Sequence, residues 1–194
     1  MIFYKKEVPK YLKIFINILI FLYLISSVFF LINFKINRFS PCLCCLILTL
    51  LIKYLSKKFI NIISHILITS ILIFIFFASY LGSSFNFYGL IPHYDDIMHF
   101  LSGVLTVLLG YDIFTLLSTD INIKINRKVI IIFVFSFTLA VAGIWELLEF
   151  SIDALLATNM QVGGLKDTMH DMIDAILASI ISVPFYEFYF KRYK

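Results

Sequence analysis

The stretch from Trp145 to Asp174, WELLEFSIDALLATNMQVGGLKDTMHDMID, sets acidic residues among side chains apolar enough to lie in a membrane. Half of the chain's twelve acidic residues fall here, namely Glu146, Glu149, Asp153, Asp167, Asp171 and Asp174. An ionisable group at membrane depth costs about 2.5–3.5 kcal/mol on insertion scales, so such groups are by default candidates for a functional site. The stretch therefore predicts a membrane-embedded fold, and its acidic residues predict where the functional site lies.

The composition of the whole chain supports this assignment. Of its 194 residues, 61% are hydrophobic and only 14% are charged, and the mean hydropathy is +0.99. A soluble domain of this length could not bury so much apolar surface, so we predict an all-α, polytopic membrane helical bundle that forms a single domain over residues 1–194. The net charge of +4 does not indicate a nucleic-acid partner, because the basic residues are scattered between apolar runs. The expected partners are membrane lipids.

Six apolar segments approach the ~20 residues that a helix needs to cross a bilayer. They run roughly over 11–33, 39–55, 59–81, 96–117, 129–150 and 168–190. The second segment is the weakest because it is short, begins at Ser40-Pro41 and ends in Lys53. A re-entrant segment is the alternative to a span at this position.

The basic residues predict the orientation of the six segments. With the N-terminus inside, thirteen of the sixteen basic residues fall in inner segments, and only Lys35, Arg38 and Lys166 fall in outer ones. This bias favours N-in and C-in termini under the positive-inside rule, in a bacterial-type cell membrane. It also favours a full second span, since otherwise the N-terminus or the basic run at 53–58 would lie outside.

Most of the acidic residues gather at the predicted outer side. They lie at the outer ends of the last three segments or in the loops that join them, and three histidines accompany them. The set comprises Asp95, Asp96, Glu146, Glu149, Asp153, Asp167, Asp171, Asp174, His93, His99 and His170. The basic residue nearby is Lys166.

Some of these residues have a simpler explanation as helix caps. Asp95 or Asp96 can cap the fourth segment, and Asp167 can cap the sixth, because free N–H groups and the helix dipole favour acids at a helix start. His99 lies one turn into its segment, on the face of Asp95 and Asp96. Asp174 lies two turns into the sixth segment, which is too deep for a cap.

The fifth segment is the most informative. Its outer end is a helix C-terminus, where Glu146, Glu149 and Asp153 share one face at i, i+3 and i+7. Like charges at these spacings repel, and the dipole of a helix C-terminus adds to the cost. We therefore expect either protonated carboxyl groups in a neutral hydrogen-bonded network or a bound cation. Oxygen and imidazole ligands suit Mg, Mn, Zn or Fe.

We predict a divalent metal site at this cluster. The principal candidate ligands are Asp95, His99, Glu146, Glu149, Asp171 and Asp174, and the weaker ones are Asp96, Asp153, Asp167 and His170. The carboxylate–histidine spacings are similar to those of di-metal helical bundles. The chain has no Gly-x-Ser-x-Gly motif and no P-loop, which argues against a familiar hydrolase or nucleotide site. The function expected is action on a lipid or envelope substrate. The alternatives are a structural polar network and a proton- or ion-coupled transporter.

Three blocks of the chain resemble the YjdF-like family of uncharacterised bacterial inner-membrane proteins. They are Tyr94–Phe100 with Gly103 beyond, Trp145–Phe150, and Gly164–Met172. The resemblance covers roughly residues 92–182, and it implies several membrane spans without implying a particular activity. His170 stands where the resemblance leads us to expect an aromatic residue.

Overall fold

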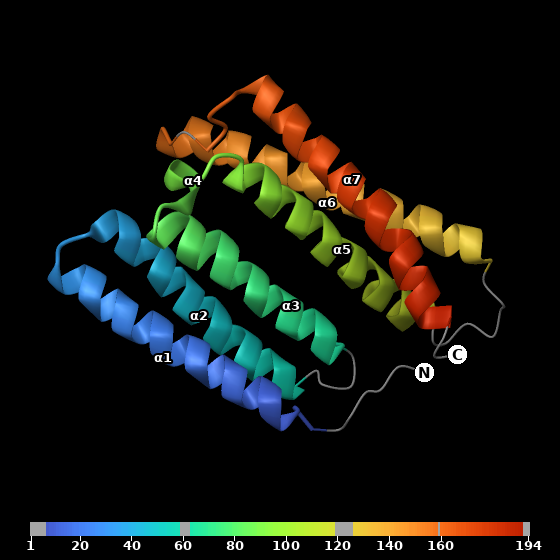
Figure 1. Ribbon diagram of the computed structural model, residues 1–194, viewed down its shortest axis with the longest axis horizontal. Coiled ribbons are helices and arrows are strands. Elements are labelled where there is room, and N and C mark those ends of the chain that lie inside the picture. Colours follow the sequence, from blue (N-terminus) through green and yellow to red (C-terminus); the bar gives the residue numbers. More distant parts are fainter. Residues whose placement is uncertain (1–6, 59–62, 119–125, 159, 192–194) are drawn as a thin grey trace. The chain divides into compact units, whose positions relative to one another are not determined.

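The computed structural model describes residues 7–58, 63–118, 126–158 and 160–191. Across these ranges the chain is helical and contains no strand (Figure 1). Six helical stretches are long and apolar enough to cross a membrane. The chain divides into two compact units, Met1–Tyr94 and Asp95–Lys194. The predicted all-α membrane bundle with six spans is thus confirmed, whereas the N-in, C-in orientation and the single domain stay predictions.

Unit 1 is built from five helical elements. They are α1 (Lys10–Ile32), α2 (Ile36–Lys58), α3 (His65–Ile75), the π-helix η1 (Phe76–Ser84) and the short α4 (Phe87–Leu90). The helix α3 runs directly into η1, so the two together make one candidate span. Ser64 caps α3 by accepting a hydrogen bond from the N–H of Leu67 at 3.1 Å.

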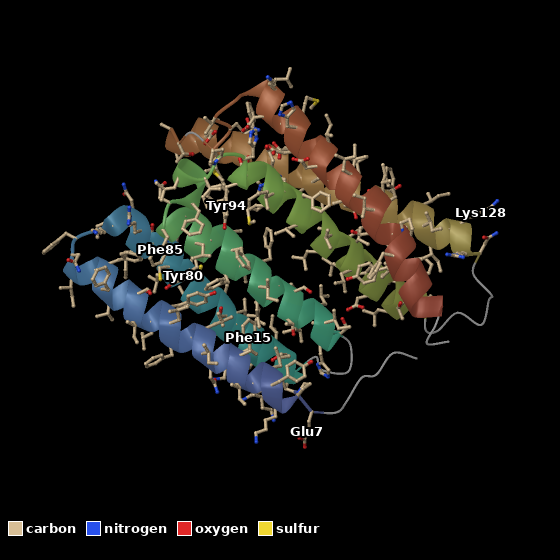
Figure 2. All side chains as sticks on the ribbon, viewed as in Figure 1. Glu7, Phe15, Tyr80, Phe85, Tyr94 and Lys128 are labelled. Atoms are coloured by element: carbon tan, nitrogen blue, oxygen red, sulfur yellow. The ribbon has the colours of Figure 1, made fainter. Side chains whose placement is uncertain are left out.

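The core of unit 1 combines aliphatic and aromatic side chains. Tyr23 of α1 and Tyr80 of η1 lie with ring centroids 5.0 Å apart, and the hydroxyls of Tyr80 and Ser26 share a 2.7 Å hydrogen bond. Phe85 packs edge-on against Tyr80 at a centroid distance of 5.0 Å (Figure 2). These contacts bind η1 to α1 without charged groups. Unit 1 therefore has the character of a packed apolar bundle.

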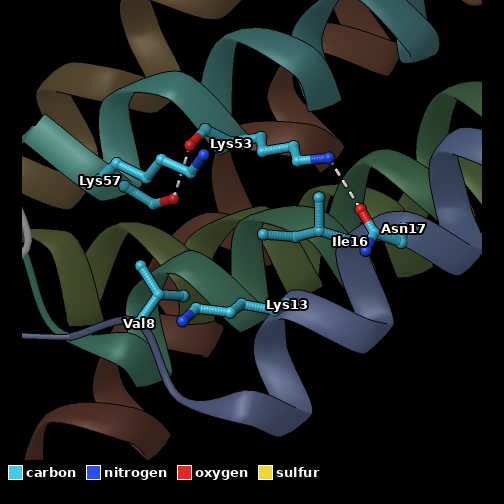
Figure 3. A pocket seen from close by; sticks show the side chains of 7 residues that line it. Val8, Lys13, Ile16, Asn17, Lys53 and Lys57 are labelled. Atoms are coloured by element: carbon cyan, nitrogen blue, oxygen red, sulfur yellow. Dashed lines mark hydrogen bonds between the residues drawn. The ribbon is translucent and has the colours of Figure 1, made fainter.

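Lysines gather at one end of unit 1. Lys13, Lys53 and Lys57 line a pocket with Val8 and Asn17 (Figure 3). The ammonium group of Lys53 donates a 2.8 Å hydrogen bond to Oδ1 of Asn17. These three lysines come from segments that the charge map assigns to the inner side. Their grouping at the beginning of α1 and the end of α2 agrees with that map.

Unit 2 contains α5 (Tyr94–Ser118), α6 (Arg127–Leu156) and α7 (Leu165–Lys191). Asn126 caps α6 by accepting a hydrogen bond from the N–H of Lys128 at 2.9 Å. The buried residues Val107, Tyr111, Val134 and Val183 form an apolar core that draws on all three helices. This core packs together the same three helices that carry the acidic cluster.

Small residues let the helices of unit 2 approach closely. A Cβ atom added at Gly103 of α5 would lie 2.6 Å from Cβ of Ala178 and 3.1 Å from Cα of Ala175, both in α7. A Cβ atom added at Gly110 would lie 3.1 Å from the ring of Phe137 in α6. The expected close packing along this face of α5 is therefore present.

Several predicted helix boundaries differ from those of the structure, including the third span, which runs from His65 to Ser84. The second helix begins at Ile36 and not at residue 39, with Pro41 inside it. Because Pro41 lies near the helix start, it removes a single hydrogen bond to the carbonyl at position 37. The fifth segment continues past residue 150 to Leu156, and the sixth begins at Leu165. Residues 59–62 of the third predicted segment lie outside the described residues.

We predict that Gly103→Ala destabilises the protein. The added methyl group would meet Ala178 at a distance that atoms do not tolerate, and overpacking of this kind typically costs about 1–3 kcal/mol. The melting temperature of the purified protein in detergent should therefore fall. Gly143→Ala is the matched control, because its nearest contact would be Cε of Met172 at 4.0 Å. Equal melting temperatures for the two variants would contradict the close approach of α5 and α7.

Candidate metal centre

Three helices of unit 2 bring the acidic cluster together. The first two turns of α5 supply Asp95, Asp96 and His99, and the first turns of α7 supply Asp171 and Asp174. The helix α6 runs in the opposite direction, so it contributes residues from its later turns. A cluster that is dispersed over some eighty positions of sequence is thus formed at one end of unit 2.

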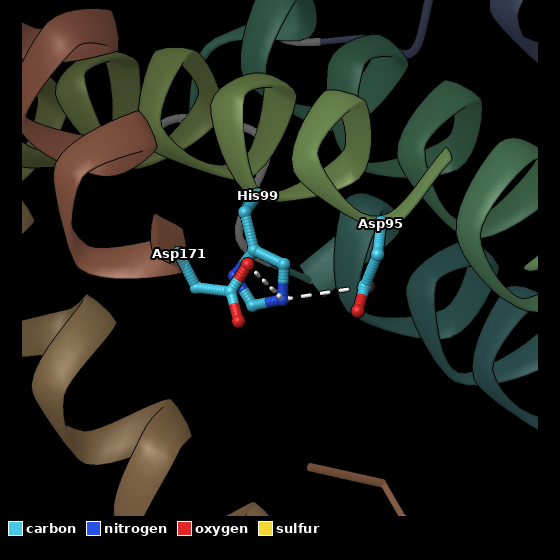
Figure 4. A group of neighbouring side chains, drawn as sticks. All are labelled: Asp95, His99 and Asp171. Carbon is cyan, nitrogen blue, oxygen red and sulfur yellow. Dashed lines mark ion pairs between the residues drawn. The ribbon is translucent and has the colours of Figure 1, made fainter. Parts of the chain in front are cut away.

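His99 lies at the centre of this cluster (Figure 4). Its Nε2 atom is 3.6 Å from Oδ1 of Asp95 and 3.7 Å from Oδ1 of Asp171. These distances exceed those of a hydrogen bond, whose mode is about 2.9–3.0 Å for N–H···O. The three ligand atoms all lie within 4.8 Å of one another. The arrangement is a convergent set of one imidazole nitrogen and two carboxyl oxygens.

Glu146 faces the other nitrogen of the same ring. Its Oε1 atom is 3.9 Å from Nδ1 of His99, and its Oε2 atom accepts a 3.5 Å hydrogen bond from Nε2 of Gln161. The same Nε2 of Gln161 lies 3.0 Å from Oγ1 of Thr168. A metal-bound histidine commonly directs its second ring nitrogen to a carboxylate, which fixes the orientation of the ring. Glu146 therefore lies on the side of the ring where an orienting carboxylate would sit, at a distance too long for a hydrogen bond.

Asp171 is the most deeply buried acid of the described residues. Only 2% of it is exposed, and its Oδ2 atom has no hydrogen-bond partner in the part of the chain that the structure describes. An unsatisfied buried polar atom typically costs about 1–3 kcal/mol, more if it carries charge. The ion pairs of Asp171, Glu146 and Asp95 among the described residues all go to His99, and none goes to a lysine or arginine.

Asp171 also belongs to a second group of carboxyl groups. Oxygen atoms of Asp96, Asp171 and Asp174 lie within 4.8 Å of one another. Asp96 and Asp174 are partly exposed, whereas Asp171 is buried. Asp174 makes no hydrogen bond or ion pair with the described residues. Asp171 is thus the residue that the two groups share.

The remaining predicted residues lie outside both groups. Glu149 is buried, and its Oε1 atom accepts a 2.8 Å hydrogen bond from Nε1 of Trp145. Asp167 is half-buried in the first turn of α7, which begins at Leu165, so it does not hold the predicted N-cap position. His170 is exposed. The structure therefore gathers Asp95, Asp96, His99, Asp171 and Asp174 as possible ligands.

Asp153 anchors the loop that follows α6. Its carboxylate accepts hydrogen bonds from Oγ1 of Thr158 at 2.6 Å and from the backbone N–H groups of Met160 at 2.8 Å and Gln161 at 3.0 Å. Both carboxylate oxygens of Asp153 are thus engaged by hydrogen-bond donors of the loop, so they are not free to bind a metal ion. The loop in turn places Gln161 against Glu146.

Glu146 and Glu149 do not lie at the C-terminal end of α6, contrary to the prediction. Because α6 ends at Leu156, both residues lie roughly two to three turns before its C-terminus. The dipole acts mainly within the last turn, so it does not oppose them. Their unfavourable environment comes instead from burial and from the neighbouring carboxyl groups.

Sequence reasoning missed the contributions of Gln161, Thr168 and Trp145. The position of Gln161, just before Gly163-Gly164 in a polar loop between two acidic segments, was the available signal. Nothing in the sequence pairs Gln161 with Glu146, since they lie 15 positions apart and meet only through the turn of the loop.

We predict that Asp153→Ala loosens the loop without removing metal ligands. Three donors of the loop lose their common acceptor, so the amides of Met160 and Gln161 should exchange hydrogen faster, as followed by mass spectrometry. Ser151→Ala is the control, because the Ser151 hydroxyl donates to the carbonyl of Leu147 in its own helix. Loss of divalent metal from the Asp153→Ala protein would show instead that Asp153 belongs to the metal site.

Comparisons with known proteins agree with this fold. Residues 13–192 match a family model described as predicted membrane protein, DUF2238. An uncharacterised protein of Thermotoga maritima is 31% identical over 103 residues, which are 53% of this chain and 52% of that protein. The chain therefore spans about half the length of this curated relative. No solved structure matches the chain. Because the family model covers nearly the whole chain and fits the expected resemblance to uncharacterised bacterial membrane proteins, the chain belongs to the DUF2238 family of predicted membrane proteins.

Proposed function

We propose that this protein binds a divalent metal ion at the extracytoplasmic end of its last three spans and uses it to act on a lipid or envelope substrate. The ligands are Asp95, His99 and Asp171, and Glu146 orients the histidine. The observation that carries the proposal is the meeting of Nε2 of His99 with two carboxyl oxygens around the buried Asp171. The site lies in the plasma membrane of a bacterial-type cell.

Two of the three distances between the ligand atoms fit a metal ion. Ligand atoms bound to one ion at about 2.0–2.2 Å lie roughly 2.9–3.6 Å apart, depending on the coordination geometry. The distances of 3.6 and 3.7 Å from Nε2 of His99 need only a small contraction to reach this range. One imidazole and two carboxylates suit Zn, Fe or Mn better than Mg or Ca, because imidazole is a borderline ligand.

A purely structural network accounts less well for the same atoms. Such a network stabilises a bundle when each buried polar atom has a hydrogen-bond partner. Here the nitrogens of His99 lie 3.6–3.9 Å from the carboxyl oxygens, and Oδ2 of Asp171 has no partner among the described residues. These atoms converge without bonding to one another, as ligands around an ion do.

A transport function is also less favoured. A transport path needs polar groups along the length of the bundle. The buried Thr138 of α6 donates its hydroxyl to the carbonyl of Val134 in its own helix, so it offers no donor to a neighbour. The carboxyl groups of Asp95, Glu146 and Asp171 lie together at one end of unit 2.

The surroundings of the cluster favour a lipid substrate. On α6, the buried Glu146 and Glu149 alternate with exposed apolar residues such as Trp145, Leu148 and Phe150. In a bilayer these side chains lie among lipid, with Trp145 suited to the headgroup level. A substrate anchored in the membrane can therefore approach the cluster from the side.

We predict that His99→Ala and Asp171→Asn abolish metal binding at the position formed by Asp95, His99 and Asp171. Each variant removes one of three ligands, so the dissociation constant should rise by more than the roughly 10–100-fold typical of changes outside the coordination sphere. Metal content is measured by plasma mass spectrometry after dialysis against Zn²⁺ or Mn²⁺. His170→Ala is the control, since that histidine is exposed and lies outside the cluster. Wild-type protein without bound metal, or equal metal content in all variants, would refute the proposal.

The predicted side of the membrane can be tested separately. In a variant whose native cysteines at 42, 44 and 45 are replaced by serine, Lys166→Cys should react with an impermeant maleimide added to intact cells. Lys166 is exposed in the loop that leads into α7. Lys57→Cys, at the exposed end of α2, should react only after lysis. The reverse pattern would place the cluster at the cytoplasmic face and leave metal binding untouched.

A further inference from the structure

Asp171 takes part in two ligand groups at once. It converges with Asp95 and His99 in one group and with Asp96 and Asp174 in the other, and the ligand atoms of each group lie within 4.8 Å of one another. Both groups are formed by the starts of α5 and α7. A carboxylate has two oxygen atoms, so a single aspartate can serve both groups.

The second group consists of carboxyl groups alone. Three such groups within 4.8 Å of one another repel when ionised, and the burial of Asp171 strengthens the repulsion. Asp171 and Asp174 make no ion pair with a lysine or arginine of the described residues. His99 pairs with Asp171 through Oδ1 only. The second oxygen of Asp171, Oδ2, therefore has no hydrogen-bond partner among the described residues.

A second observation points to a ligand at this group. Asp171 is 98% buried, and its Oδ2 atom has no hydrogen-bond partner among the described residues, although Oδ1 faces His99. In Figure 4 the two oxygens of Asp171 point in different directions, with one toward the imidazole. The oxygen that does not face His99 thus remains available to a second ion.

We propose that the site is binuclear: a second divalent cation is bound by Asp96, Asp171 and Asp174, and Asp171 bridges the two ions. This proposal rests on the first metal site described above and extends it. The two positions differ in chemistry, because the first offers an imidazole nitrogen and the second offers oxygen alone. Oxygen ligands suit Mg²⁺ or Mn²⁺, so the second position takes a harder ion than the first.

A bridged pair also narrows the class of substrate. Two ions held by a common carboxylate lie about 3.5–4 Å apart, the spacing at which metal pairs stabilise the attacking and leaving oxygens of a displacement at phosphorus. The substrate class that fits such a pair is a phosphate ester, and in a membrane that means a lipid headgroup.

Manganese tests the binuclear site, because Mn²⁺ suits both positions and is paramagnetic. Wild-type protein equilibrated with Mn²⁺ should bind two ions per chain, and its electron paramagnetic resonance spectrum should show exchange coupling. Asp174→Asn should bind one ion and give the signal of isolated Mn²⁺. Asp171→Asn should lose the coupling and at least one ion. Glu7→Gln, which changes an exposed acid outside both groups, should behave as wild type.

The outcomes separate this proposal from the one it extends. One Mn²⁺ per chain in wild type, unchanged in Asp174→Asn, would overturn the second ion while the first metal site stands. Two ions without coupling would overturn the bridge by Asp171. No bound Mn²⁺ or Zn²⁺ in wild type would overturn both proposals. The single ion retained by Asp174→Asn also serves as evidence that this variant is folded.

Discussion

The structure of unit 2 depends on how three helices hold several carboxyl groups around a single imidazole. Asp95, Glu146 and Asp171 approach His99 from three helices, and no lysine or arginine of the described chain pairs with them. Such a set is costly in an apolar bundle, because each buried carboxyl group needs a hydrogen bond or a positive partner. The bundle therefore keeps an arrangement that packing alone would disfavour, and function is the usual reason for such a cost.

The close packing beside the cluster sets its dimensions. Gly103 lies one turn after His99 in α5, and it faces Ala175 and Ala178, which lie one and two turns after Asp171 in α7. If larger residues separated these helices, the histidine and the aspartate would move apart by a comparable distance. Ligand spacing tolerates only a few tenths of an ångström. The small residues are thus part of the site although they carry no functional group.

The sequence predicts the fold well and the site only in part. Long apolar segments and periodic faces suffice for the six spans and for the pairing of Asp171 with Asp174. They did not reveal that α6 continues to Leu156, because hydropathy falls at Asp153 while the helix does not end there. Which acids meet His99 depends on how each helix is rotated about its axis, and tertiary packing decides that rotation. Asp153 therefore looked like a ligand until its contacts with the loop were known.

The distribution of hydrogen bonds within the cluster distinguishes its two sides. On the side of α6, the loop held by Asp153 carries Gln161 to Glu146, and Trp145 donates to Glu149, so these acids have protein partners. On the side of α5 and α7, Asp171 and Asp174 lack such donors among the described residues. A bundle stabilised only by its polar network would be expected to satisfy both sides alike. The asymmetry agrees with the proposed metal site, in which the α6 side supports the ligands and the α5–α7 side supplies them.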